Sequence, residues 1–300
     1  MKRADLQLSR LVVISPVRDE ADNFPCTLAS VLAQSKKPDR WIIVDDGSRD
    51  STRQMLEDVS KRLDFVTLVT LGDRGRRLAG PGVVRAMEAG LEAVGDYPWD
   101  FLAKLDGDVE LPPCYYQKIL EEFAADDKLG IAAGQCISPH TRTWVVERNA
   151  PYHTRGPCKV WRRECFEQIG GLRPVLGWDG LDGYEARMKG WHTRTLDELK
   201  VLHLRPTHSW EGRFKGAMRS GRGAYNQHYR PEYFAARVLV HMLRRPYLVG
   251  ALGMAAGFLS AWLTGHERKL DRLLVEHIRQ EQAVRLRRLL TGKGEAVDER

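Results

Sequence analysis

The sequence predicts an α/β fold in which helices flank a mostly parallel sheet. Over the first 112 residues, short runs rich in Val, Ile and Leu alternate with amphipathic stretches, as in strand–helix–strand units. Two of these apolar runs end in acidic residues, as expected where strand ends form a binding site. Hydrophobic residues at 43% and charged residues at 29% describe a globular chain, and 300 residues suffice for one large or two modest domains.

The elements of the first part follow this alternation in order. Each strand is expected where β-branched and apolar residues cluster, and each helix where apolar residues recur on one face. Strands are expected over 10–17, 65–71 and 100–111, and from residue 40 into a turn that ends at 52. Helices are expected over 24–35, 53–63 and 80–94.

After residue 112 the pattern becomes mixed. We expect a helix over 112–127 and a strand over 129–138. Residues 139–158 are polar and aromatic without a clean period, so we expect a long loop of the kind that is functional or mobile. A first domain is predicted over 1–210, in two halves over about 1–112 and about 113–210, and a helical region follows over 211–300.

The two acidic strand ends are the first candidate site. Asp45 and Asp46 follow one strand, and Asp106 and Asp108 follow another, with Gly107 allowing a close backbone approach. Ligands of an open parallel sheet bind beyond the carboxyl ends of its strands. Carboxylate oxygens suit Mg²⁺ or Mn²⁺, which also takes ligands from water and substrate phosphates. The alternative is that each acidic pair only forms a turn.

Four segments then carry a resemblance to a known family. They are residues 14–52 around "VDDGS", 104–111 "KLDGDVEL", 159–172 "KVWRRECFEQIGGL" and 177–191 "GWDGLDGYEARMKGW". In order and spacing they resemble the signatures of family 2 glycosyltransferases with the GT-A fold, over roughly residues 11–205. The resemblance implies a UDP- or GDP-sugar as donor and Mn²⁺ or Mg²⁺ as cofactor.

The resemblance also implies roles for single residues near the first two strand ends. Pro16, Arg18 and Glu20 would line the nucleotide pocket. Asp45 and Asp46 would contact the base and its ribose.

Further residues would hold the diphosphate and the metal. Lys104 would lie close to the diphosphate, Asp106 would lie nearer the ribose and the metal, and Asp108 would bind the metal directly. His203 is a further candidate as a metal or phosphate ligand, and a histidine that merely ends a strand is the alternative.

An acceptor hydroxyl needs a general base, usually a carboxylate. In the family this base follows a Gly-Gly pair, and counting from Gly171 points to Asp179, with Trp178 in place of the usual glutamate. Asp182 is the second candidate, or it caps the helix that follows.

The C-terminal region suggests membrane association. Residues 246–265 are nearly uncharged, about the roughly 20 residues that a spanning helix needs, so they are expected to span, re-enter or lie on a membrane, or to be a buried helix. Small residues recur along one side, which would let another helix approach closely: Gly250, Gly253, Gly257, Ser260 and Thr264. Residues 266–290 form a basic amphipathic helix suited to anionic lipid, or to packing on the catalytic domain or a second copy. Its apolar face is expected to hold Leu270, Leu273, Leu274, His277 and Ile278.

Composition limits where the protein acts and what it binds. The net charge is +7 and the pI about 9.2, but no nucleic-acid motif accompanies the charge, so a membrane surface is the expected anionic partner. Five cysteines without CxxC spacing indicate a reduced compartment. The N-terminal apolar run "LVVI" is too short for a signal peptide.

The predicted function is that of an inverting, metal-dependent glycosyltransferase at the cytoplasmic face of the cell membrane. It would transfer one sugar from a nucleotide-sugar to a saccharide or lipid-linked acceptor in polysaccharide or glycolipid synthesis, since the Gln-x-x-Arg-Trp box of processive synthases is absent from the sequence. The sequence is also compatible with a homodimer. The alternatives are a non-catalytic, membrane-docked nucleotide-sugar binding module and a sugar nucleotidyltransferase.

Overall fold

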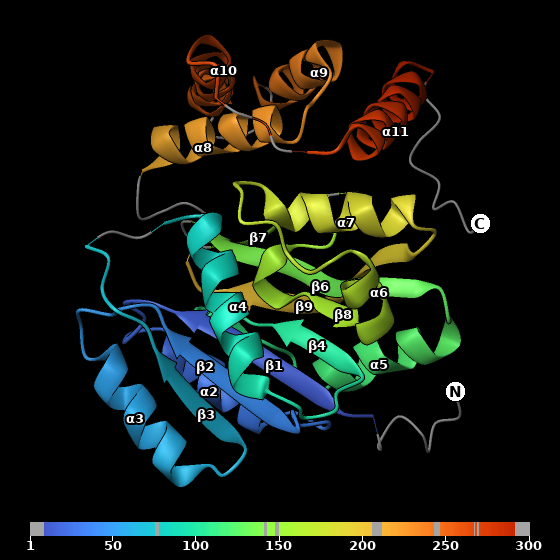
Figure 1. The fold of residues 1–300 in the computed structure, drawn as a ribbon. Helices are drawn as coiled ribbons and strands as arrows, with labels where there is room; N and C mark the ends of the chain where they lie inside the picture. The colour runs from blue at the N-terminus through green and yellow to red at the C-terminus, as the bar shows by residue number, and fades with distance from the viewer. Residues whose placement is uncertain are drawn as a thin grey trace.

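The computed structural model describes residues 9–75, 78–140, 143–147, 150–205, 212–242, 247–266, 268 and 270–291. A twisted sheet with helices on both faces forms the larger part of the molecule, and four C-terminal helices lie above it (Figure 1). We call these four helices, α8 to α11, the helical cap.

The sheet has nine strands and two halves of different character. The strands are β1 (Leu11–Val17), β2 (Arg40–Asp45), β3 (Val66–Thr70), β4 (Phe101–Lys104), β5 (Val109–Glu110), β6 (Leu129–His140), β7 (Thr143–Val146), β8 (Val160–Arg162) and β9 (His192–His203). Their order is β3-β2-β1-β4-β8-β6-β9-β5, with β7 paired to β6. The α/β fold is confirmed. The pairs among β3, β2, β1 and β4 are parallel, but β8 is antiparallel to both β4 and β6, so the second half of the sheet is mixed.

The helices of the first part lie where the amphipathic pattern predicts them. They are α2 (Phe24–Leu32), α3 (Thr52–Arg62), α4 (Pro81–Val94) and α5 (Tyr115–Ala125). Further along the chain are the 3₁₀ turn η1 (Gly156–Cys158), α6 (Arg163–Gln168) and α7 (Trp178–Met188). The cap consists of α8 (Arg213–Asn226), α9 (Pro231–Met242), α10 (Tyr247–Leu263) and α11 (Arg272–Leu290).

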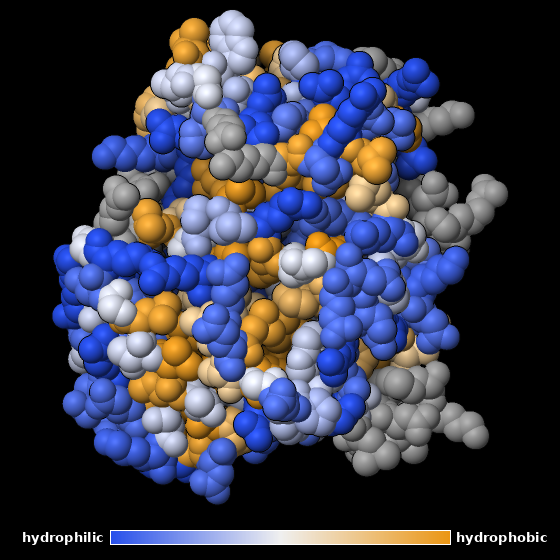
Figure 2. Space-filling model, in the orientation of Figure 1, coloured by the Kyte–Doolittle hydropathy of each residue, from blue (hydrophilic) through white to orange (hydrophobic). Residues whose placement is uncertain are grey.

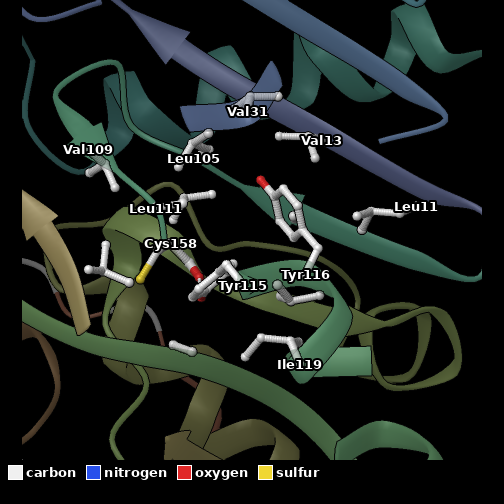
Figure 3. Packing of buried hydrophobic residues seen from close by; sticks show 14 of the residues in the cluster. Leu11, Val13, Val31, Leu105, Val109, Leu111, Tyr115, Tyr116, Ile119 and Cys158 are labelled. Carbon is white, nitrogen blue, oxygen red and sulfur yellow. Dashed lines mark hydrogen bonds between the residues drawn. The ribbon is translucent and has the colours of Figure 1, made fainter. Parts of the chain in front are cut away.

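Two hydrophobic cores lie on opposite faces of the sheet because successive strand residues point to opposite sides. In β1, Leu11 and Val13 face the core that α2, α3 and α5 cover, and Val12 and Ile14 face the core under α4, α6 and α7. Figure 3 shows Leu11 and Val13 beside Tyr116 of α5 in the first of these cores. The two cores fix the strand ends at which the site residues lie.

The expected loop over 139–158 is partly wrong. Residues 143–146 form β7, which pairs with β6 through Ile137 and Val146, and residues 156–158 form η1. All four residues of β7 are exposed, so the strand has no buried face. Its sequence therefore lacks the alternation of apolar and polar residues that would predict a strand.

Residues 247–263 form α10, which packs along α8. Within the described ranges, no helix combines the length and the apolar character needed to cross a bilayer. The predicted stripe of small residues does mediate a close approach. A Cβ added at Gly257 would lie 1.9 Å from the Met218 carbonyl oxygen, and one at Gly221 would lie 1.9 Å from that of Met254.

The basic amphipathic segment corresponds to α11, which packs on α7. Leu274 and Ile278 are buried against Leu181 and Tyr184, so the apolar face of α11 packs on α7 of the same chain. The prediction that Leu273 lies on the same face is wrong, since its side chain is 70% exposed.

Candidate functional site

The carboxyl ends of β1, β2 and β4 meet at one edge of the sheet. The three strands are adjacent and parallel, so the residues that follow them emerge side by side. Pro16 lies in β1 opposite Val44 of β2. Arg18, just past β1, donates to the Asp46 carbonyl at 2.7 Å and to Asp73 Oδ1 at 2.7 Å. The structure therefore brings the residues expected in the nucleotide pocket together.

Asp45 and Asp46 differ in how their carboxylates are used. Asp45 is fully buried, accepting at Oδ1 from the Ser48 N–H at 2.9 Å and at Oδ2 from Arg53 Nε at 2.9 Å. Asp46 forms an ion pair with Arg74 through one oxygen, whereas its buried Oδ1 has no hydrogen-bond partner among the described residues. Burial raises the pKa of Asp46 despite Arg74. Its unpaired oxygen is the one that a bound ligand would satisfy.

Lys104 and Asp106 form the next pair. Lys104 is buried at the end of β4 and contacts the Asp106 carboxylate, and it donates to the Gly156 carbonyl at 3.0 Å. The Asp106 N–H donates to the Pro157 carbonyl at 2.9 Å. Burial, together with the Asp108 charge, raises the pKa of Asp106. The 3₁₀ turn η1 therefore holds this strand end in place.

Asp108 lies between the side chains of His203 and Arg205. Its Oδ1 is 3.6 Å from His203 Nε2, and its Oδ2 accepts from Arg205 Nε at 3.1 Å. Arg205 also forms an ion pair with Glu20, and Glu147 Oε1 lies 3.6 Å from His203 Nδ1. Burial alone would raise the pKa of Asp108, but His203 and Arg205 lower it to about 2. His203 does end β9, and it also reaches the site.

The residues around Asp108 fit part of a divalent cation site. Among the described residues, no three His, Cys, Asp or Glu side chains form a group that could hold a metal ion by themselves. Asp108 Oδ1 and His203 Nε2 are both ligand atoms, and their 3.6 Å separation suits two ligands of one cation with bonds of roughly 2.1 Å. Such a cation would take its other ligands from water and substrate phosphates.

Asp182 is fully engaged in structural contacts. Helix α7 starts after Gly177, which has a left-handed φ of 91°, so Asp182 lies in the second turn and the prediction that it caps a helix is wrong. Both carboxylate oxygens lie 2.8 Å from Lys159 Nζ, and Oδ2 also accepts from Trp161 Nε1 at 3.0 Å. With 2% of its surface exposed, Asp182 has no oxygen available to a substrate.

Asp179 lies one turn earlier and is different. Its side chain is half-buried, and no hydrogen bond joins its carboxylate to another described residue. A Cβ on Gly156 would touch the Asp179 Cβ at 3.3 Å, and Gly156 also accepts from Lys104. Burial alone would raise the pKa of Asp179, but the charges of Lys159, His153, Arg155 and Lys104 lower it. Asp179 is therefore an ionised carboxylate beside the Lys104–Asp106 pair.

Four residues of this site escape sequence reasoning: Arg74, Glu147, Arg155 and Lys159. Arg74 follows β3 in the basic run "GDRGRR", which is a weak signal for an anion site. Glu147 and Arg155 pair with each other at 2.5 Å from within the segment expected as a loop. Lys159 lies in a recognised motif, but only the fold shows that it neutralises Asp182.

A family model described as glycosyl transferase family 2 matches residues 12–173, more than half of the chain. The chain belongs to glycosyl transferase family 2. The match runs from β1 to just past α6 and so includes the acidic ends of β2 and β4. Asp179 and His203 lie beyond it.

Curated relatives match less than half of this family 2 chain. Poly-beta-1,6-N-acetyl-D-glucosamine synthase of Staphylococcus aureus (strain MSSA476) is 28% identical over 138 residues, which is 44% of this chain and 31% of the relative. The corresponding synthase of strain COL is 27% identical over the same shares. The chain therefore matches about a third of the length of these curated relatives.

Solved structures resemble nearly the whole chain. The mannosyltransferase PcManGT from Pyrobaculum calidifontis, in complex with GDP-Man and Mn²⁺, has a TM-score of 0.54 at 14% identity and covers 95% of this chain and 88% of its own. GalNAc-T7 with UDP, GalNAc and Mn²⁺ has a TM-score of 0.59 at 14% identity, covering 93% of this chain and 57% of its own. At this identity the likeness shows the fold, which is the GT-A fold expected from the sequence.

Proposed function

We propose that this chain is an inverting, metal-dependent glycosyltransferase that moves one sugar from a nucleotide-sugar to an acceptor hydroxyl. The observation that carries the proposal is the position of Asp179. The Cβ of its side chain lies next to Gly156, whose carbonyl accepts from Lys104, and Lys104 contacts Asp106. A base candidate and a diphosphate-binding candidate therefore share one wall of the site.

The donor would bind along the acidic strand ends. The unpaired oxygen of Asp46 would accept a hydrogen bond from the base or ribose, with Pro16 and Arg18 alongside. Lys104 would offset the charge of the diphosphate from its buried position. Glu20, held by Arg205, would help to orient Asp108.

Asp108 and His203 would hold the Mn²⁺ or Mg²⁺, with Asp106 next to them. When bound, the cation would supply Lewis-acid stabilisation of the leaving diphosphate. Two solved structures of similar fold contain Mn²⁺, which supports the choice of cation. Arg205 would keep one Asp108 oxygen in place and leave the other turned toward His203.

Asp179 would act as the general base. It would accept the proton of the acceptor hydroxyl while that oxygen attacks the anomeric carbon from the face opposite the leaving diphosphate, which inverts the configuration. Asp182 would act as a positioning residue, because Lys159 bridges its carboxylate and the Asp179 carbonyl, which accepts at 2.7 Å.

Family membership favours sugar transfer over a nucleotidyltransferase. The free Asp179 carboxylate favours it over a binding module that has lost its base. We further propose a saccharide or lipid-linked acceptor at the cytoplasmic face of the cell membrane, in polysaccharide synthesis, as the name of the curated relatives suggests. Those relatives are polymer synthases, so transfer of a single sugar is a separate part of the proposal.

A transfer assay with UDP- and GDP-sugars and Mn²⁺ tests this function. We expect activity with at least one donor and its loss on chelation. Asp179→Asn should lower kcat by roughly 10²–10⁴-fold, the usual contribution of a general base, while nucleotide binding persists. Asp108→Asn should weaken metal-dependent nucleotide binding.

The matched control is Asp96→Asn, an exposed carboxylate in the turn after α4, which should change neither quantity. Turnover of no donor, or Asp179→Asn with full activity, would refute the assignment.

A further inference from the structure

Helix α10 is apolar on all sides, but most of its large side chains point outward. Its inner face, packed on α8 and α9, consists of small residues together with Met254 and Phe258. Its six large outward residues are between 47% and 75% exposed: Leu248, Val249, Leu252, Leu259, Trp262 and Leu263. A helix that served only the core would have the opposite arrangement. The outward face of α10 is therefore suited to an apolar environment.

The exposed apolar surface extends beyond α10 onto its neighbours. Leu239, Val240 and Met242 are exposed at the end of α9, and Phe214 of α8 is 45% exposed beside Gly253. We call these residues, with the six of α10, the cap surface. Figure 2 shows apolar residues reaching the surface over this end of the molecule. Exposed large apolar side chains on three adjacent helices are typical of an interaction site in a folded protein.

The net charge of the chain comes from the stretch of sequence that contains the cap surface. Residues 212–266 contain eight Lys and Arg side chains and one acidic side chain, Glu232, which is a net charge of +7. The whole chain also carries +7, so the remaining residues are neutral in sum. Lys215 and Arg222 of α8 are exposed, and Arg222 Nε reaches Ser260 of α10 at 3.4 Å.

We propose that the cap surface docks the protein on an anionic membrane, with α10 lying in the plane of the headgroups. Apolar side chains would enter the boundary between headgroups and acyl chains, and the surrounding cations would attract acidic lipids. A second copy of the chain is disfavoured as the occupant, because two segments of net charge +7 would face each other.

Docking there would orient the candidate active site. Gln227, which directly follows α8, donates from Nε2 to the Gly177 carbonyl at 2.9 Å, and Gly177 precedes the first turn of α7 with Asp179. A surface that packs on α8 thus lies one helix from the candidate base. The link to a lipid-linked acceptor rests on the proposed function, whereas the docking itself does not.

Vesicle flotation of the full chain tests the proposal. We expect binding to phosphatidylcholine vesicles that contain phosphatidylglycerol, weaker binding at high salt, and little binding to pure phosphatidylcholine. The double substitution Leu252→Glu, Leu259→Glu should weaken partition by roughly tenfold or more, because both side chains are exposed and must leave water. Circular dichroism should show an unchanged fold.

The matched control is Leu273→Glu, which changes an equally exposed leucine on α11 outside the cap surface and should bind vesicles normally. The proposal would be overturned if both variants lost vesicle binding equally, or if the parent chain bound neutral vesicles as well as anionic ones. It would also be overturned if the chain formed a dimer in solution that the double substitution made monomeric. Transfer to a soluble acceptor without vesicles is measured in parallel. A chain that binds vesicles but transfers no sugar refutes the proposed function and leaves the docking intact.

Discussion

Asp179 and Asp182 show how neighbours decide what a carboxylate can do. The two residues lie one turn apart on α7, and the sequence favours Asp179 by its distance from Gly171 while leaving Asp182 as the second candidate. Lys159, Trp161 and the Gly183 N–H occupy the oxygens of Asp182, while those of Asp179 stay free of other described residues. Of the two carboxylates, that of Asp179 therefore suits the proposed role of base better.

Substitution of Asp182 should reduce stability more than substitution of Asp179. Asp182→Asn leaves the Lys159 ammonium buried without a charged partner, which should cost about 3–5 kcal/mol in the free energy of unfolding. Asp179→Asn should cost less, because no hydrogen bond joins its carboxylate to another described residue, while kcat should fall. Urea unfolding of both variants measures the difference, and equal stability of the two would contradict the assigned roles.

At the scale of the element, the α8–α10 pair depends on three glycines at the contact. Gly221 faces the Met254 carbonyl, and Gly253 and Gly257 face the backbone of α8. Glycine weakens an isolated helix by about 1 kcal/mol relative to alanine, so its presence here reflects the close approach of two backbones. The contact holds α10 with most of its large side chains turned away from the rest of the protein.

Two glycine substitutions in α8 should have opposite effects. Gly221→Ala would place a Cβ 1.9 Å from a backbone oxygen, so α8 and α10 must separate, at a cost of about 1–3 kcal/mol. Gly223→Ala meets its nearest atoms only at 3.9 Å and should be neutral or stabilise by up to about 1 kcal/mol. Thermal unfolding compares them, and similar midpoints would refute the tight contact.

At the scale of the whole molecule, a charge network joins the cap to the catalytic part. Glu281 of α11 accepts from Arg187 of α7 at 2.9 Å, from Arg285 at 2.6 Å and pairs with His277 at 2.9 Å. Arg285 also donates to the Tyr184 hydroxyl at 3.2 Å. Burial alone would raise the pKa of Glu281, but His277 and the two arginines lower it to about 2.

This network should make the stability of the chain depend on pH. Because the folded pKa of Glu281 is below its ordinary value of 4.5, its contribution is present above that value and is lost as the pH falls toward 2. Glu281→Gln should cost about 2–3 kcal/mol at pH 7. The gap between variant and parent in urea unfolding should narrow at acid pH, and a gap independent of pH would disprove the role of Glu281.

The sequence by itself determined the parallel half of the sheet and the acidic residues at its edge. Periodic apolar residues specify strands and helices locally, and the ends of parallel strands must meet at one edge. The resemblance to the family identified Asp179 and Asp182 as candidate bases. The stripe of small residues over 246–265 predicted a close contact with another helix. The expectation for 143–146 failed because an exposed strand leaves no alternating pattern.

Only the tertiary structure decided which of these groups are free. Lys159 and Asp182 are 23 residues apart, and Arg187 and Glu281 are 94 residues apart, so no local pattern relates them. The direction in which the large residues of α10 point depends on what packs against its glycines. Charge neutralisation and helix contacts arise between distant segments, so the available base and the exposed cap surface could be identified only in the folded chain.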